Sequence, residues 1–172
     1  MERSDPAPAV VICDAGPLIH LDELGCLDLL SDFPRVIVPE SVWREVETHR
    51  PQALVNRAVP LERRSVAKKK DPEIEALATV FLLQRGEADA LRIMRECRSG
   101  LLLTDDTAAR LAARGLGMQV HGTLGIVVRA IRRRQRTPAQ VVGLLRAILD
   151  RSTLFVKRAL LEGIIQQIEQ QL

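Results

Sequence analysis

The chain has 172 residues, of which 47% are hydrophobic, so its length fits one domain with a core of ordinary size. No run approaches the roughly 20 continuous apolar residues that a membrane span needs, and the N-terminus does not resemble a signal peptide. The net charge of +3 is uneven, because residues 1–121 carry −3 and residues 122–172 carry +6. An acidic body with a basic C-terminal segment suggests a metal site in one place and a site for a polyanion or acidic partner in the other.

The cysteines and aromatic residues exclude further classes. Cys13, Cys26 and Cys97 are odd in number and lack a CxxC spacing, and the three histidines form no zinc pattern with them. Free thiols are typical of a reducing compartment, so we expect a cytoplasmic location. One Trp, three Phe and no Tyr argue against a base-stacking platform.

The predicted elements alternate along the chain. Apolar runs predict strands at 10–13, 35–39, 101–104 and 118–120. Helices are predicted at 18–30 with a break near Gly25, after an N-cap at Ser41, and at 72–83, 87–98, 107–114, 123–134, 138–149 and 154–171. The segment 50–71, which contains the run Lys68-Lys69-Lys70, is expected to be a loop with short local structure.

This alternation predicts the architecture. Strands that are apolar throughout, rather than alternating, indicate a parallel sheet covered on both faces. We therefore expect an α/β protein, a three-layer α/β/α sandwich with a four- to five-stranded, mainly parallel sheet. Residues 1–130 would form the main domain, and residues 131–172 a helical extension packed on it.

Acidic residues follow the predicted strands, where parallel sheets gather their functional groups. Asp14 follows the first strand, Asp105 and Asp106 follow the third, and Glu45 or Glu47 lies in the helix after the second. Carboxylates that converge repel each other unless a cation neutralises them, and Mg²⁺ or Mn²⁺ prefers such oxygen ligands. Asp14 and one of the adjacent Asp105 and Asp106 could instead be helix caps, and Glu45 could be a solvated helix residue.

The helix before the third strand carries two further acids. Glu87 heads the apolar stripe of Ala90, Leu91 and Met94, so we expect it to point toward the sheet. Asp89 shares its side with Arg92 and Glu96, which predicts a solvated position. Helix geometry does not decide whether Glu45 or Glu47 points toward the candidate site, because both flank the apolar stripe of the helix by similar angles.

These segments together resemble the PIN-domain family. The matching pieces are Val11-Ile12-Cys13-Asp14-Ala15-Gly16-Pro17-Leu18-Ile19, Val38-Pro39 followed by Val42-x-x-Glu45-Val46, Gly86-Glu87-Ala88-Asp89-Ala90-Leu91, and Leu102-Leu103-Thr104-Asp105-Asp106-x-Ala108-Ala109-Arg110. The run Val120-His121-Gly122-Thr123-Leu124-Gly125-Ile126 is similar to a bacterial and archaeal branch of that family. Each motif is weak alone, but four in order over residues 9–130 are fairly specific.

The resemblance implies a Mg²⁺- or Mn²⁺-dependent endoribonuclease, the toxin half of a toxin–antitoxin pair, with RNA as substrate, an antitoxin protein as partner and a homodimer as assembly. Carried over by position, the acidic residues would be Asp14, Glu45, Glu87 and Asp106. Asp14, Glu87, Asp105 and Asp106 would bind the metal, although the resemblance does not decide between the adjacent Asp105 and Asp106 as the ligand. The sequence departs from the family at Ala15, where Ser or Thr is usual, and at Glu87, where Asp is more frequent.

The sequence also allows other interpretations of the function and of two basic segments. The lost hydroxyl at Ala15 favours a weak or inactive PIN-like module that binds RNA or protein, and nothing excludes a metal-dependent hydrolase acting on DNA. Arg132, Arg133 and Arg134 are candidate phosphate-binding residues, although a solvated helix end explains them equally well. Lys68-Lys69-Lys70 is more simply a solvated loop.

Overall fold

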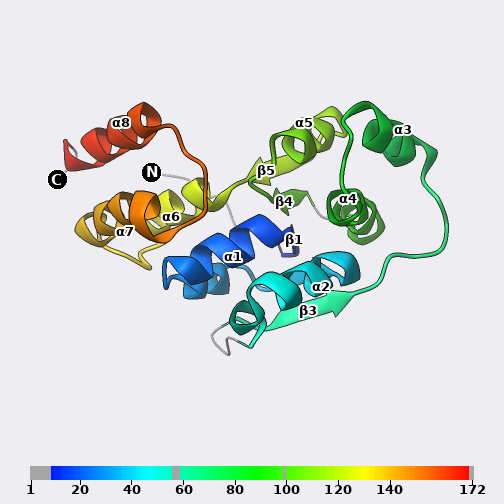
Figure 1. Ribbon diagram of the computed structural model, residues 1–172, viewed down its shortest axis with the longest axis horizontal. Coiled ribbons are helices and arrows are strands. Elements are labelled where there is room, and N and C mark those ends of the chain that lie inside the picture. Colours follow the sequence, from blue (N-terminus) through cyan, green and yellow to red (C-terminus); the bar gives the residue numbers. More distant parts are fainter. Residues whose placement is uncertain (1–8, 56–58, 99, 171–172) are drawn as a thin grey trace.

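Five parallel strands form one sheet in the computed structural model, which describes residues 9–55, 59–98 and 100–170 (Figure 1). The strands are β1 (Val11–Cys13), β2 (Val36–Pro39), β3 (Leu61–Arg64), β4 (Leu101–Leu103) and β5 (Gln119–His121). Their order across the sheet is β3-β2-β1-β4-β5, and the four pairings are parallel. The carboxyl ends of the strands therefore lie along one edge, with the end of β1 at its centre.

Helices fill the connections between the strands. Along the chain they are α1 (Ala15–Glu23), the 3-10 helix η1 (Leu27–Asp32), α2 (Glu40–His49), the 3-10 helix η2 (Pro51–Leu54), α3 (Pro72–Val80), α4 (Arg85–Cys97), α5 (Thr107–Gly115), α6 (Thr123–Arg132), α7 (Pro138–Arg151) and α8 (Arg158–Glu169). This arrangement confirms the predicted α/β class with additional C-terminal helices.

The sheet has an apolar core on each face, because successive side chains of a strand point to opposite sides. Val11 and Cys13 of β1 pack with buried residues of α1, α2 and α6, whereas Ile12 packs with those of α3, α4 and α5. The strands are apolar at every position except on the two edge strands β3 and β5. Burial on both faces explains the continuous apolar runs seen in the sequence.

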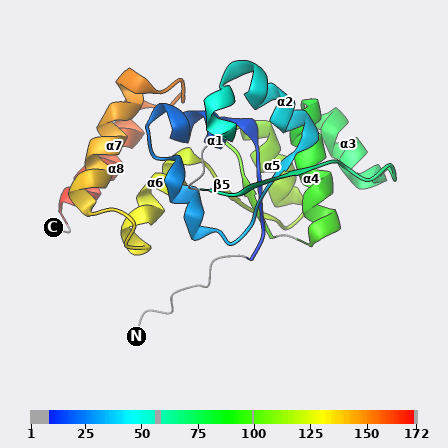
Figure 2. The ribbon, with the colours of Figure 1, turned by 90° about the horizontal axis from the view of Figure 1, so that it is seen from below.

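The C-terminal helices lie at one end of the molecule, beside α1 and η1 (Figures 1 and 2). Helix α6 contacts both of them, α7 packs on α6, and α8 packs on α7. Buried residues of all three helices belong to the same apolar core as α1. Polar contacts add to this packing, since Arg129 and Arg133 both pair with Asp32 at 2.6 Å. Within the described ranges, no helix is long and apolar enough to cross a membrane.

Some sequence-based boundaries were wrong. The segment 50–71 contains β3, which was not predicted, and residues 152–157 lie outside any helix. Ser41 does not cap α2, because the helix begins at Glu40, with Pro39 at the N-cap position. Helix α1 begins at Ala15, so Pro17 stands in its first turn, where its missing N–H breaks no intrahelical bond.

Candidate functional site

A pocket of about 290 Å³ opens at the carboxyl edge of the sheet, beside the ends of β1 and β4. Five of its lining residues are acidic, namely Asp14, Glu45, Glu87, Asp105 and Asp106. His20 also lines it, and no lysine or arginine is found among the described residues of the lining. We call this hollow the carboxylate pocket. The structure thus brings the acidic residues predicted from the sequence into one place.

Asp14 lies deepest of these residues, with only 8% of its surface exposed. It occupies the N-cap position of α1, but its side chain makes no capping hydrogen bond to that helix. One oxygen instead accepts a 2.8 Å hydrogen bond from the hydroxyl of Thr104, at the end of β4. Burial raises the pKa of Asp14 to about 6, helped by Glu45 and Asp106 and opposed by the Thr104 hydroxyl and the Ala15 N–H.

Thr104 was missed by the sequence reasoning, which treated it only as a strand residue. It is fully buried and donates to the carboxylate that sits next to Ala15. The first acid therefore has a hydroxyl partner although the residue after it is Ala15. The signal that could have indicated it is its position at the end of β4, directly before Asp105-Asp106.

Glu87 has two contacts of different kinds. It is half-buried in the lining of the carboxylate pocket, and it accepts a 2.7 Å hydrogen bond from the backbone N–H of Gln84, before α4. Burial raises its pKa to about 7, with further contributions from Asp106, Asp14 and Glu45, while the Gln84 N–H acts against the rise. Glu87 is therefore both a helix-end acceptor and a carboxylate of the pocket.

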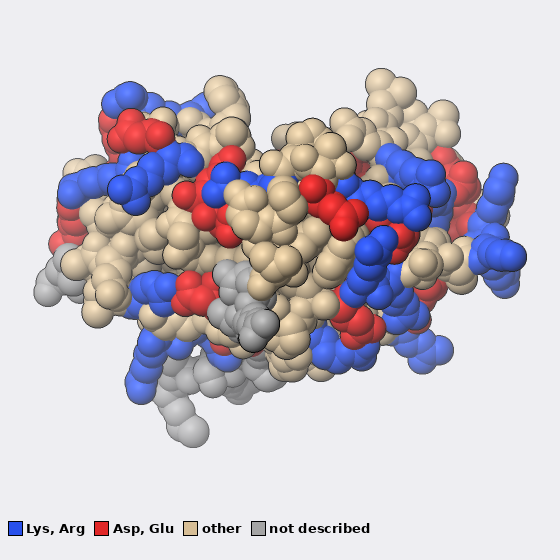
Figure 3. All heavy atoms as spheres, turned by 60° about the horizontal axis from the view of Figure 1, so that its bottom comes forward, with Lys and Arg blue, Asp and Glu red and all other residues tan. Residues whose placement is uncertain are grey.

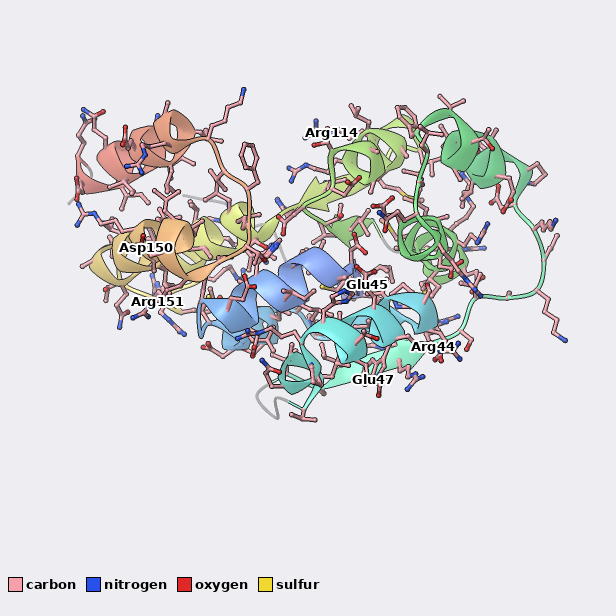
Figure 4. The ribbon with its side chains drawn as sticks, in the orientation of Figure 1. Arg44, Glu45, Glu47, Arg114, Asp150 and Arg151 are labelled. Atoms are coloured by element: carbon pink, nitrogen blue, oxygen red, sulfur yellow. The ribbon has the colours of Figure 1, made fainter. Side chains whose placement is uncertain are left out.

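The structure also shows which of Glu45 and Glu47 faces the carboxylate pocket, which the helix pattern left open. Glu45 lies on the side of α2 that faces α1 and lines the carboxylate pocket, whereas Glu47 lies on the side near β3 (Figure 4). Gly86 lets α4 approach α2 at this point, because a Cβ there would lie 3.0 Å from Val42 and 3.7 Å from the Glu45 carboxylate. A glycine at the start of α4 thus brings Glu87 and Glu45 to one pocket.

The adjacent Asp105 and Asp106 differ in their partners. Asp106 is the N-cap of α5, and one of its oxygens accepts the Ala109 N–H at 2.8 Å. Asp105 accepts from the backbone N–H and the hydroxyl of Thr123 at 2.7 and 2.6 Å, and its Oδ2 lies 2.8 Å from Nδ1 of His20. Both Asp105 oxygens are thus engaged by α6 and α1, whereas Asp106 keeps one oxygen without a partner among the described residues.

The prediction that Asp89 is solvated was wrong. Only 7% of Asp89 is exposed, and it accepts a 2.7 Å hydrogen bond from the hydroxyl of Ser41. Arg92 donates to its other oxygen at 2.6 Å and also pairs with Glu75. The helix pattern placed Asp89 away from the sheet, but α2 and α3 cover that side of α4. Asp89 is thus a structural anion outside the lining of the carboxylate pocket.

The arginines proposed to bind phosphate lie away from this pocket. Thr123 at the start of α6 contacts Asp105, and Arg132 ends the same helix about 14 Å further along at 1.5 Å per residue. Arg133 is paired with Asp32, and Arg132 and Arg134 are exposed. The structure therefore does not bring Arg132, Arg133 and Arg134 to the acidic residues.

The chemistry of the donor set suits a hard divalent cation. A buried carboxylate surrounded by other carboxylates is unfavourable without a counter-cation, and the described lining supplies none. In the described part of the chain, no three His, Cys, Asp or Glu side chains lie close enough together to hold a metal ion directly. This spacing is compatible with Mg²⁺, which is usually bound by one or two carboxylates and retains several water ligands.

Comparison with known proteins gives the family. The sequence model of the DUF3368 family, described as a PIN domain, matches residues 10–170, so the chain belongs to the PIN-domain family. The fold is similar to that of a PilT N-terminus domain protein from the hyperthermophilic archaeon Sulfolobus solfataricus P2, with a TM-score of 0.50 and 13% sequence identity over 68% of this chain and 89% of that one. No curated protein matches the sequence. PIN domains are generally metal-dependent nucleases, typically with divalent cations.

Proposed function

We propose that this protein is a Mg²⁺- or Mn²⁺-dependent endoribonuclease. The observation that carries the proposal is the carboxylate pocket, where acidic side chains from four separate segments meet with no described cationic side chain among them. One or two of the carboxylates Asp14, Glu87 and Asp106 would bind the cation directly, and the others, with Glu45, would bind its water ligands. A bound divalent cation would stabilise negative charge on the phosphodiester and lower the pKa of a bound water.

The residues of the chain have distinct roles in this proposal. The Thr104 hydroxyl orients the Asp14 carboxylate, and the Gln84 N–H orients Glu87. Asp105 is a positioning residue, because its contacts with Thr123 and His20 fix the loop that carries Asp106. The Thr104 contact supports an active site, because it gives Asp14 a hydroxyl partner although Ala15 has none.

The cleavage experiment compares RNA and single-stranded DNA of the same sequence, each with Mg²⁺, with Mn²⁺ and with a chelator. We expect cleavage of the RNA that requires the cation and is lost in Asp14→Asn, because an amide keeps the shape of the side chain but removes its charge. Preference for the DNA strand would support the DNA hydrolase instead. Binding of RNA without cleavage in any of these conditions would support the inactive module.

We further propose that the nuclease acts as a toxin under the control of an antitoxin protein and that it forms a homodimer. The support is the resemblance of its motifs to the toxin branch of the family, together with exposed apolar side chains at Phe155 and Leu160 beside Asp105. Expression of the wild-type chain should arrest bacterial growth, whereas Asp14→Asn should not. Co-expression of the product of a neighbouring gene should restore growth, and light scattering should give twice the mass of the chain.

A further inference from the structure

We propose that the groove between the N-termini of α2 and α4 and the segment 65–70 binds the phosphate backbone of a single-stranded nucleic acid and guides it into the carboxylate pocket. This proposal rests on the proposed nuclease function and adds the path of the substrate. The groove, which we call the lysine groove, has a volume of about 590 Å³. It replaces Arg132, Arg133 and Arg134 as the expected phosphate-binding surface.

The lysine groove adjoins the carboxylate pocket. Glu45, Gln84 and Gly86 line both hollows, so a strand bound in the groove lies next to the pocket. The segment 65–70 leaves β3 at the same edge of the sheet at which β1 and β4 end. It then connects to α3 as the arch at the right of Figure 1, beyond α4.

The charges of the groove favour a polyanion. Its lining contains six cationic and four anionic side chains, in contrast to the five acids of the carboxylate pocket. The anions Glu40, Glu75 and Asp89 already have arginine partners. Lys68, Lys69 and Lys70 are exposed, and no hydrogen bond or ion pair joins their ammonium groups to another described residue.

The unpaired lysines of the groove differ from the basic residues of the C-terminal helices, several of which pair with acids. At the C-terminal end, Arg129 and Arg133 share Asp32, and Arg136 pairs with Asp28, whereas Arg132 and Arg134 are exposed but lie away from the carboxylate pocket. In Figure 3, basic side chains gather at the end of the molecule that carries β3 and α3, interleaved with acidic ones. Unpaired cations next to a pocket for a reacting phosphate are suited to hold the neighbouring phosphates of the same strand.

The test measures binding of a short fluorescent single-stranded RNA by anisotropy as a function of salt concentration. All proteins carry Asp14→Asn, so the RNA is not cut during the measurement. The variant Lys68→Gln, Lys69→Gln, Lys70→Gln is compared with a matched control, Arg132→Gln, Arg134→Gln, Arg151→Gln. The control removes the same charge from exposed positions away from both hollows, and Arg151 lies at the opposite end of the molecule (Figure 4).

We expect the lysine variant to lose roughly 2 from the slope of log affinity against log salt, because each phosphate contact contributes about 0.7 for a single strand. The control should keep the slope of its parent. Equal slopes for the two variants, or a larger loss in the control, would overturn the proposal. Circular dichroism of both variants checks that they are folded.

A second measurement separates this proposal from the proposed nuclease function. With Asp14 restored, the lysine variant should cleave RNA with a KM raised about tenfold or more and a kcat close to that of the wild type. If the wild type cleaves no RNA but the lysine variant still loses salt dependence, the nuclease proposal fails and the groove stands. If the wild type cleaves RNA and the lysine variant has an unchanged KM, the groove fails and the nuclease proposal stands.

Discussion

At the scale of single residues, Asp14 determines how the protein should respond to pH. Its pKa is raised to about 6 in the folded state, above the ordinary value of 3.8. The ionised form is therefore disfavoured by folding, so stability falls as the pH rises from about 4 through 6 in the absence of a cation. The pKa of Glu87 is also raised, to about 7, so its ionisation lowers the stability of the folded protein at somewhat higher pH.

The first prediction concerns Asp14→Asn in the presence of a chelator. The amide avoids the unfavourable buried charge and still accepts the Thr104 hydrogen bond, so the variant should be more stable than the wild type near pH 8. The gain should approach about 3 kcal/mol, the equivalent of the shift in pKa, and should shrink by pH 4. Urea denaturation at the two pH values measures it, and a difference between the proteins that is independent of pH would contradict the assignment.

The second prediction compares two acids that stand two residues apart on α4. Glu87→Gln should weaken Mn²⁺ binding and RNA cleavage on the order of 10–100-fold. Without a cation it should be at least as stable as the wild type near pH 8, because the amide removes the disfavoured charge and its oxygen still accepts the Gln84 N–H. Asp89→Asn should leave Mn²⁺ affinity unchanged and lower the free energy of unfolding by about 1–3 kcal/mol, because it weakens charged contacts with Ser41 and Arg92. Calorimetric Mn²⁺ titration and urea denaturation separate the two effects, and the reverse pattern would place the site on the other side of α4.

At the scale of elements, the junction between β5 and α6 fixes the loop after β4. Gly122 lies between them, and a Cβ there would be 2.6 Å from the Asp105 carboxylate and 3.3 Å from the carbonyl oxygen of Thr104. Asp105 has little freedom to move away, because Thr123 and His20 hold it. A glycine at this position is therefore required for the close approach of the two segments.

The third prediction follows from this contact. Gly122→Ala should destabilise the protein by about 1–3 kcal/mol and reduce cleavage, because the overlap displaces the loop that carries Asp105 and Asp106. Gly125→Ala is the matched control, since its Cβ would meet only ordinary contacts with His121, and Gly125 lies within α6, where Ala is favoured over Gly by up to about 1 kcal/mol. Thermal unfolding of both variants gives the comparison, and equal stabilities would show that the loop accommodates a methyl group freely.

The features that the sequence did not predict depend on contacts with other segments of the chain. Strand β3 (Leu61–Arg64) has no alternating or continuous apolar pattern, because it is an edge strand that depends on pairing with β2 and on ion pairs such as Arg63 with Glu40. The burial of Asp89 depends on Ser41 and Glu75, which come from other helices. By contrast, the central strands are buried on both faces, so their composition alone predicted them.

The candidate site was predictable for a similar reason. Asp14 directly follows β1, and Asp106 comes three residues after the end of β4. The rule that parallel sheets gather functional groups at that edge placed them together. The choice of Glu45 over Glu47, the partners of Asp105 and the contact of Thr104 with Asp14 depend on how helices pack around the edge. Those contacts join residues far apart in the sequence, so local patterns do not reveal them.

At the scale of the whole molecule, charge is arranged in three regions. The carboxylate pocket lies at the middle of the sheet edge, the unpaired Lys68, Lys69 and Lys70 lie to one side, and the C-terminal helices carry arginines that are partly neutralised by Asp28 and Asp32. The net charge is only +3, but a strongly acidic centre lies beside a basic groove. Such an arrangement is suited to a polyanion whose scissile phosphate is bound together with a cation.

The central claim is that the carboxylate pocket binds a catalytic divalent cation, and Mn²⁺ titration by calorimetry near pH 8 tests it most directly. The wild type should bind Mn²⁺ with a saturable heat signal and become more resistant to thermal unfolding as the Mn²⁺ concentration rises. A parallel titration near pH 6, where Asp14 and Glu87 are partly protonated, should also release protons on binding. Asp14→Asn should lose most of this affinity, whereas Asp89→Asn should keep it. Equal Mn²⁺ binding by the wild type and Asp14→Asn, or no binding by a folded wild type, would contradict the account.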